Sequence, residues 1–310
     1  MKAILFFAIT ALGAALFASC SNQEELATGS YPSDNLIRVT AGVNNDMTRG
    51  DEAATALNKD FSLTVVNNTN DKYSYANEIF SLNGTEWSCG KNLLWQNLST
   101  PVEIVALYPA TKDNTFDGVY TKGNKSYGTI TYGVNSDQST ADEADDLLLY
   151  HNANFVPKDN LKDGKLDIQF NHAFCRVDIE VTIGTEFNAT NGLAANPIKG
   201  IRVEGTKISA DIGLASVSPT ITAKGDAASI TPTRGDFTPA ASATNQAVAR
   251  YSCMVIPQTA DLNIVLHTSD REYEWTGSQM KLESGKQYTL QLNMTNKSTT
   301  ARKFILRERK

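Results

Sequence analysis

Strict alternation of apolar and polar residues is the feature that most limits what this chain can fold into. In the segment AFCRVDIEVTIG (173–184), every second side chain from Cys175 to Ile183 is apolar, and charged or hydroxyl side chains stand between them. Successive side chains of a β-strand point to opposite faces, so the pattern predicts a half-buried strand with one face in water. The predicted buried face consists of Cys175, Val177, Ile179, Val181 and Ile183.

The same period of two recurs along most of the chain after residue 36. Helical evidence is limited to a turn or two within 52–61. Short clusters of Gly, Asn, Asp and Pro separate the alternating segments, as in all-β sandwiches. Further strands are therefore predicted at 37–43, 61–66, 101–109, 127–134, 164–170, 198–205, 250–257, 262–268, 271–277 and 286–294.

The length of 310 residues suffices for one large domain or two ordinary ones. Two polar stretches, 185–197 and 233–247, are predicted to be loops or linkers, and the first is the better candidate for a domain boundary. We therefore expect two β-sandwich domains in tandem, covering 36–185 and 186–310. The second would end in the basic run ARKFILRERK (301–310), which we expect to be a solvated tail.

The first twenty residues have the pattern of an export leader. Lys2 gives a positive start, residues 3–17 form an almost unbroken apolar run, and the small residues Ala18 and Ser19 follow. The apolar run is too short and wrongly flanked for a stable transmembrane helix.

A cysteine directly after the small pair resembles a bacterial lipobox, although Phe17 stands where Leu is commoner. We predict a lipoprotein signal peptide at 1–19, acyl chains such as palmitate on Cys20, and a polar tether at 20–35. Plain secretory cleavage, which would merely remove a cysteine with the leader, is the alternative.

Charge and cysteine content exclude several classes of protein. The net charge is −6 and the pI about 5.2, so the chain lacks the overall positive charge that is typical of nucleic-acid-binding proteins. The cysteines other than Cys20 are Cys89, Cys175 and Cys253, an odd number at long spacings, so they form neither a disulfide framework nor a zinc set. Cys175 and Cys253 are expected as small buried side chains, with one bridge among the three left open.

Motifs for catalysis are missing from the sequence. It has no G-x-S-x-G elbow and no H-E-x-x-H. We expect structural roles for His151, His172 and His267. The loop GVYTKGNKS (118–126) lacks the lysine and the following helix of a phosphate loop. The acidic run ADEADD (141–146) lacks the spacing of a calcium loop and is expected to be solvated. We therefore predict no enzyme, no cofactor and no metal site.

An ordered series of motifs covers most of the chain after residue 36. The run 73–110 spaces Asn77, Trp87 and Trp95 ahead of an apolar strand that ends in Tyr108-Pro109. It is followed by DLLLY (146–150), LDIQFNHAFCRVDIEV (166–181), IPQT (256–259) and ESGKQYTLQL (283–292). Behind a lipobox, this series resembles the fimbrillin-like family, whose members are subunits of type V pili or related Mfa-like surface lipoproteins.

The resemblance implies two β-sandwich domains of transthyretin-like, Greek-key type. It also implies a structural or accessory subunit of a cell-surface pilus or fimbria, exported as a lipoprotein to the outer membrane. An Arg-specific protease would cut after the first strand, and a strand donated by another pilus subunit would fill the groove. The implied partners are therefore other subunits, the protease and the membrane through its lipid, with no nucleic acid.

The sequence contains the parts that this scheme needs. The segment 37–43 offers one apolar face, and Arg49-Gly50 lies shortly beyond it among Asn, Asp and Gly, which favour exposed backbone. Loss of a strand leaves unpaired backbone groups that a donated strand can satisfy. The tail after residue 294 is short and basic for a donor, so an anchor or accessory subunit and an uncleaved surface lipoprotein remain open. The exchangeable face is Ile37, Val39, Ala41 and Val43.

The tetrapeptide TRGD occurs at Arg49 and again at 233–236, between Pro232 and Pro239. We expect the second copy to form a turn, and a monomeric adhesin or glycan-binding lipoprotein that contacts a host surface is the alternative function. The three tryptophans are expected in the core. The adhesive loop of that alternative would be Arg234, Gly235 and Asp236.

Overall fold

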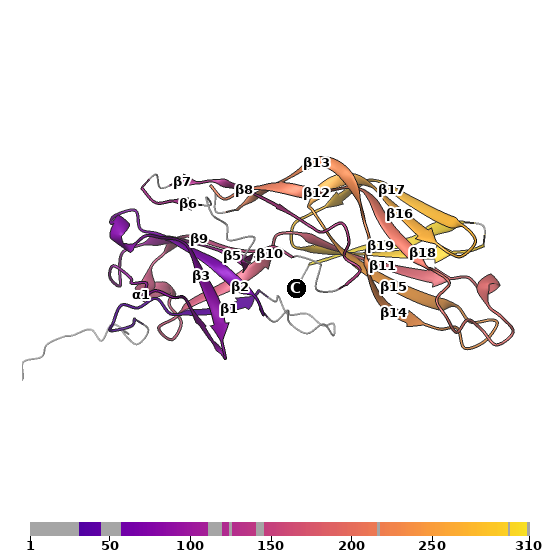
Figure 1. The fold of residues 1–310 in the computed structure, drawn as a ribbon, viewed down its shortest axis with the longest axis horizontal. Helices are drawn as coiled ribbons and strands as arrows, with labels where there is room; N and C mark the ends of the chain where they lie inside the picture. Colours follow the sequence, from indigo (N-terminus) through magenta and orange to yellow (C-terminus); the bar gives the residue numbers. More distant parts are fainter. Residues whose placement is uncertain are drawn as a thin grey trace, which may run out of the picture.

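A computed structural model describes residues 31–44, 57–110, 120–123, 126–140, 146–215, 218–296 and 298–308. The described part is built almost wholly from β-strands in an elongated arrangement, with the N-terminal and C-terminal halves side by side (Figure 1). Its helical elements are the short α1 (Pro157–Asn160) and the 3-10 turns η2 (Asp71–Tyr73) and η4 (Thr185–Phe187). The predicted all-β class is confirmed.

The N-terminal half is a closed seven-stranded barrel, where we expected a two-sheet sandwich. Its strands follow the order β1-β10-β9-β5-β2-β3-β4, and β1 closes the ring because it pairs with both β10 and β4. The bounds are β1 (Val39–Val43), β2 (Asp60–Val66), β3 (Tyr75–Asn83), β4 (Glu86–Ser88), β5 (Val102–Ala110), β9 (Leu148–Phe155) and β10 (Leu166–His172).

The C-terminal half consists of two sheets of five strands each, which share one core. One sheet has the order β14-β15-β11-β18-β19, and the other has the order β13-β12-β16-β17, with β8 (Thr129–Gly133) added on β12. The bounds are β11 (Cys175–Ile183), β12 (Gly200–Gly213), β13 (Thr220–Ile230), β14 (Thr233–Thr238), β15 (Ala247–Val255), β16 (Gln258–His267), β17 (Glu272–Leu282), β18 (Lys286–Met294) and β19 (Thr299–Glu308).

Strand β5 contributes to both hydrophobic cores. Ile104 and Ala106 point into the barrel, whereas Val105 and Leu107 belong to the cluster that continues into the second half. All four side chains are buried. Burial on both faces explains why PVEIVALYP reads as a nearly continuous apolar run rather than an alternating one.

The sheets divide the chain earlier than the expected boundary at residue 185. Strand β11 pairs with β15 and β18 in the second half, although we assigned its residues to the first. Strand β8 also leaves the first half to pair with β12, and the small hairpin of β6 (Tyr120–Thr121) and β7 (Ser126–Tyr127) precedes it. We propose a boundary at the turn between His172 and Cys175, where β10 ends and β11 begins.

Two segments expected to be irregular are edge strands. The basic C-terminal run, predicted as a solvated tail, lies in β19 and pairs along β18, whose outer edge offers unpaired backbone groups. The second TRGD, predicted as a turn, lies in β14. Its flanking prolines stand beside an edge strand, where a missing N–H is tolerated. A bulge between Arg234 and Phe237 accommodates Gly235 and Asp236.

Candidate functional site

The candidate site is the strand that closes the barrel, β1, together with the strands on either side of it. Cys20, Arg49 and Gly50 lie outside the described residues, so lipidation and cleavage there stay predictions.

The alternation predicted for the first strand is present. Ile37 and Val39 are buried, at 7% and 5% exposure, in the same cluster as the barrel interior. Ala41 and Val43 are half-buried and pack against that cluster. Burial therefore declines along β1 toward the end that leads into residues 45–56.

Strand β1 is attached to β10 along its whole length. The two strands run parallel in register, from Val39 opposite Leu166 to Val43 opposite Phe170. Backbone bonds extend the contact at both ends, from Leu166 N–H to the Arg38 carbonyl at 2.8 Å and from Asn44 N–H to the Phe170 carbonyl at 2.7 Å.

The contact with β4 on the other side is much smaller. It consists of a single register pair, Val39 opposite Trp87. Strand β4 has three residues and is supported by β3 through a hairpin in which Leu82 lies opposite Trp87. The junction of β1 with β4 is therefore the narrowest seam in the barrel wall.

An aromatic cluster lies beneath this seam. The ring of Phe61 lies 4.8 Å from Trp87, 5.3 Å from Phe80 and 5.7 Å from Phe170, measured between centroids. Phe61, Phe80 and Phe170 are completely or almost completely buried. Departure of β1 would open a groove with this cluster at its base and the unpaired edge of β10 along one side.

The chain enters β1 through a short, well-bonded segment. Ile37 N–H donates to the Leu93 carbonyl at 2.8 Å, and Trp95 N–H donates to the Asn35 carbonyl at 2.8 Å. The Arg38 guanidinium donates to the Asp34 carboxylate at 2.5 Å and lowers the pKa of Asp34 to about 2. This pair lies at the surface, beside the start of β1.

The two ends of the segment that contains Arg49 are anchored at the same end of the barrel. Asn44 is held by Phe170, as described above. On the far side, the Tyr108 hydroxyl accepts from Asn58 N–H at 3.3 Å and donates to the Asn58 side chain at 3.1 Å. The rings of Tyr108 and Phe170 lie 6.1 Å apart. Cleavage between these anchors would leave β1 attached by non-covalent contacts alone.

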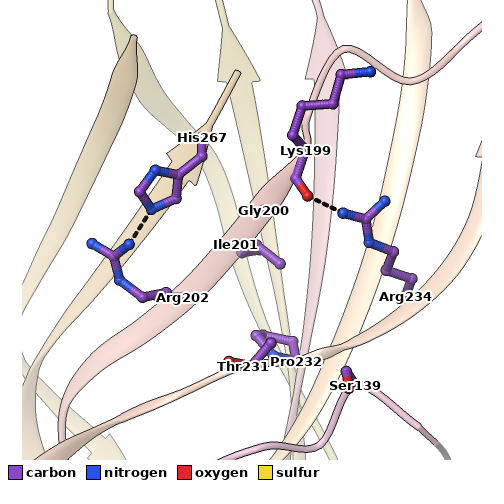
Figure 2. A pocket seen from close by; sticks show the side chains of 9 residues that line it. All are labelled: Ser139, Lys199, Gly200, Ile201, Arg202, Thr231, Pro232, Arg234 and His267. Atoms are coloured by element: carbon purple, nitrogen blue, oxygen red, sulfur yellow. Dashed lines mark hydrogen bonds between the residues drawn. The ribbon is translucent and has the colours of Figure 1, made fainter. Parts of the chain in front are cut away.

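The second TRGD does not present its three residues as one loop. Arg234, Gly235 and Asp236 are all exposed in β14, but the Arg234 guanidinium turns to donate to the backbone carbonyl of Lys199 (Figure 2). Arg234 is therefore part of the contact between β14 and the start of β12. Adhesion through this tripeptide stays a prediction.

The three histidines each have a carboxylate partner that sequence reasoning missed. His151 lies 2.7 Å from Glu103, His172 lies 2.5 Å from Asp146, and His267 lies 2.9 Å from Glu272. Pairing of β5 with β9 brings together His151 and Glu103, which lie 48 residues apart in the sequence. His267 and Glu272 face each other across the hairpin of β16 and β17, and their short separation in the sequence was the available signal for that pair.

The described residues contain no group of three or more side chains suited to hold a metal ion. Within the same ranges, Cys89, Cys175 and Cys253 form no disulfide, and no helix is long and apolar enough to cross a membrane.

Comparison with known families gives one match over most of the chain. A family model described as fimbrillin-like matches residues 38–304. No curated protein matches the chain by sequence.

Solved structures share this fold at low sequence identity. A proposed cell adhesion protein from Bacteroides uniformis has a TM-score of 0.59 at 14% identity, covering 89% of this chain and 99% of that one. One from Bacteroides ovatus has a TM-score of 0.59 at 14% identity, covering 89% and 98%. A fimbrial protein from Bacteroides vulgatus has a TM-score of 0.50 at 12% identity, covering 88% and 99%.

Proposed function

Because this chain belongs to the fimbrillin-like family, we propose that it is a fimbrial subunit, exported as a lipoprotein and assembled by strand exchange after cleavage at Arg49. Membership supports a fimbrial or adhesive role at the cell surface and association with other fimbrial subunits. The proposed partners are those subunits, an Arg-specific protease and the outer membrane through lipid on Cys20.

The narrow contact between β1 and β4 is the observation that carries this proposal. Five register pairs bind it to β10, but a single pair, from Val39 to Trp87, joins it to β4. A strand held in this way can leave without disturbing the hairpin of β3 and β4. A donor that adds to the edge of β10 would restore the same backbone bonds.

The apolar face of β1 sets what a donor must supply. Burying one Val or Ile side chain fully contributes about 1.5–3 kcal/mol. Ile37 and Val39 are the two most buried side chains of the segment, so a donor must place apolar residues two positions apart above the aromatic cluster. Alternation of apolar side chains would fix the register of the donated strand.

The C-terminal segment suggests which role in assembly this subunit has. Strand β19 occupies the outer edge of β18 within its own chain. Donation of this segment would first require the whole pairing with β18 to break. We therefore propose a subunit that accepts a strand without donating its own tail, as an anchor or accessory subunit would.

Two arginine-to-lysine variants test the proposal, because an Arg-specific protease discriminates against lysine while the charge is kept. In Arg49→Lys, we expect the mature N-terminus to remain at Cys20 and incorporation into fimbriae to fall at least tenfold. Arg38→Lys is the matched control, since Arg38 lies next to β1 and pairs with Asp34. The control should be processed like the parent chain, with Gly50 as its new N-terminus.

Mass spectrometry of the N-terminus and electron microscopy of the cell surface read the two steps separately. Normal assembly of an uncut Arg49→Lys chain would refute the cleavage step. Cleavage at Arg49 followed by retention of β1 in a monomer, even with excess partner subunit, would refute strand exchange.

A further inference from the structure

A cavity in the C-terminal half lies far from β1 in the sequence and has a distinctive charge. Its volume is about 340 Å³, and it lies where the start of β12, the end of β16 and the start of β14 come together. Arg202 and His267 stand on one side of it and Arg234 on the other, with Ile201 between them (Figure 2).

The cavity carries more positive than negative charge. Arg202 is balanced by Glu204, whose carboxylate lies 2.9 Å from its guanidinium. Lys199 and Arg234 have no ion-pair partner among the described residues, and their recorded bonds go to backbone carbonyls. Two uncompensated cations at the rim of a small cavity attract an anion more strongly than they would on an open surface.

Hydrogen bonds hold the side chains of Arg202 and His267 on the first side of the cavity. A guanidinium can only donate, so the contact of Arg202 with His267 makes the imidazole Nε2 an acceptor. The ring proton then lies on Nδ1, which faces the Glu272 carboxylate at 2.9 Å. Glu204, Arg202, His267 and Glu272 therefore form one connected network beside the cavity.

On the opposite side, Arg234 is held by a single bond. One of its Nη groups donates to the Lys199 carbonyl, and its other N–H donors have no recorded partner in the described part of the chain. A guanidinium has five donors arranged to bind planar anionic groups in pairs. Arg234 is therefore positioned to bind an anion without first losing a competing carboxylate.

The remaining lining suits a sugar ring better than a simple ion. Ile201 is buried and supplies an apolar surface, with Pro232 beside it, and Ser139 and Thr231 add hydroxyl groups. Small-molecule sites begin at about 300 Å³ and combine apolar walls with a few polar groups. An aspartate or glutamate side chain would meet the cations but would leave the hydroxyl groups unused.

We propose that this cavity binds an acidic sugar residue, a pyranose that carries a carboxylate or a sulfate. Arg234 and Lys199 would bind the anionic group, Ile201 and Pro232 would contact the ring, and Ser139 and Thr231 would meet its hydroxyl groups. This inference is independent of strand exchange, because β1 contributes nothing to the cavity.

Histidine NMR of the purified full chain gives a direct test. The chain has three histidines, and only His267 lines the cavity, so His151 and His172 serve as internal references. Methyl glucuronide, a methyl glucoside sulfate, neutral methyl glucoside and a short blocked glutamate peptide are titrated separately. We expect one or both acidic sugars to shift the ring signals of His267 and to leave those of His151 and His172 unchanged. Comparison of the glucuronide with the sulfated glucoside shows whether the cavity binds a carboxylate or a sulfate.

Variants that each remove one positive charge then show which side chains bind the acidic sugar. Removing one charged hydrogen bond should weaken binding of the acidic sugar about tenfold or more in Arg234→Gln. Lys199→Gln, at an exposed position, should also weaken binding and provides a second variant if Arg234→Gln is unstable. Lys281→Gln removes a charge that pairs with Glu283 outside the cavity, and its affinity should match the parent.

Four results would overturn the proposal. One is no His267 shift at about 50 mM acidic sugar, far above a Kd of about 1 mM. Another is equal binding of neutral methyl glucoside, and the third is binding of the glutamate peptide as tight as that of either acidic sugar. Loss of affinity in Lys281→Gln equal to that in Arg234→Gln would likewise count against this cavity.

Discussion

Val39 and Trp87 form the single register pair through which β1 reaches β4 and closes the barrel. On its other side, β1 has five register pairs with β10. The ring of Trp87 also packs edge-on against Phe61 at 4.8 Å, so one side chain supports both the seam and the aromatic cluster below it. Stability of the seam should therefore depend strongly on Trp87.

We predict that Trp87→Ala lowers the free energy of unfolding of the barrel and speeds local opening of β1. Core Trp-to-Ala changes cost about 3–5 kcal/mol, and since Trp87 is half-buried we expect about 2–3 kcal/mol. Urea unfolding would measure the global loss. Hydrogen exchange of the Val39–Val43 amides would measure the local opening.

The control for this variant is Leu98→Ala, because Leu98 is 42% exposed in the same half of the chain. It should change stability by no more than about 0.5 kcal/mol. Equal exchange rates for β1 in Trp87→Ala and in Leu98→Ala would show that the seam does not control the opening of this strand.

The pair of Asp34 and Arg38 predicts how the entry to β1 responds to acid. The Arg38 guanidinium lowers the pKa of Asp34 to about 2, below the usual value near 3.9. A lowered folded-state pKa stabilises the folded chain above the unfolded pKa, and this contribution is lost as the pH falls through about 2. The carboxyl carbon of Asp34, followed by NMR, should titrate with a midpoint near 2.

In Arg38→Gln, the pKa of Asp34 should rise toward about 3.9. It should stay somewhat lower, because Leu36 N–H still donates to the Asp34 carboxylate at 3.1 Å. Lys91→Gln, which removes a cation paired with Glu78, should leave Asp34 unchanged. The same Asp34 midpoint in the parent and in Arg38→Gln would rule out the pair as its cause.

The sequence predicts individual strands well wherever one face is wet. Strand β11 alternates cleanly because Arg176, Asp178 and Glu180 lie on its exposed side. Of the apolar face predicted for the first strand, Ile37 and Val39 are buried, whereas Ala41 and Val43 are half-buried. Local alternation carries this information and requires no knowledge of neighbouring strands.

Partnerships between strands were beyond sequence reasoning, because they depend on contacts between distant segments. Closure of the barrel depends on Val39 meeting Trp87, and assignment of β11 to the second half depends on its register with β15 and β18. Turn-favouring composition was misleading at the second TRGD. Its Gly and Asp fill a bulge in an edge strand, where the same residues are tolerated.

Gln138 fills a gap that β14 leaves at the end of β15. Its buried side chain donates to the Met254 carbonyl at 3.0 Å and accepts from Met254 N–H at 2.7 Å, where a longer β14 would have paired. We predict that Gln138→Ala, which leaves both groups unsatisfied, costs about 2–4 kcal/mol of stability. Thermal unfolding would measure the loss.

Thr140→Ala is the control for Gln138, since Thr140 is exposed two residues further along the chain. It should unfold like the parent. Gln138→Glu keeps an acceptor for Met254 N–H but loses the donor to its carbonyl, so its stability should lie between those of the parent and Gln138→Ala. Equal stability of the parent, Gln138→Glu and Gln138→Ala would show that the N–H and carbonyl of Met254 find other hydrogen-bond partners.

Pairing of β19 with β18 predicts that the basic C-terminus is structural. A chain that ends at residue 297 would expose the outer edge of β18 along Lys286–Met294. Loss of this ladder should lower the free energy of unfolding, because each backbone hydrogen bond contributes about 1 kcal/mol. The exposed edge should also promote self-association, which light scattering over a range of concentrations would detect.

A synthetic peptide of residues 299–308 provides the complementary measurement. It should bind the truncated chain, restore the monomer and raise the unfolding temperature, because it refills the edge of β18. The intact chain should not bind it, since its own β19 occupies that edge. If the truncated chain stays monomeric and as stable as the parent, the terminus is a solvated tail, as its composition alone predicted.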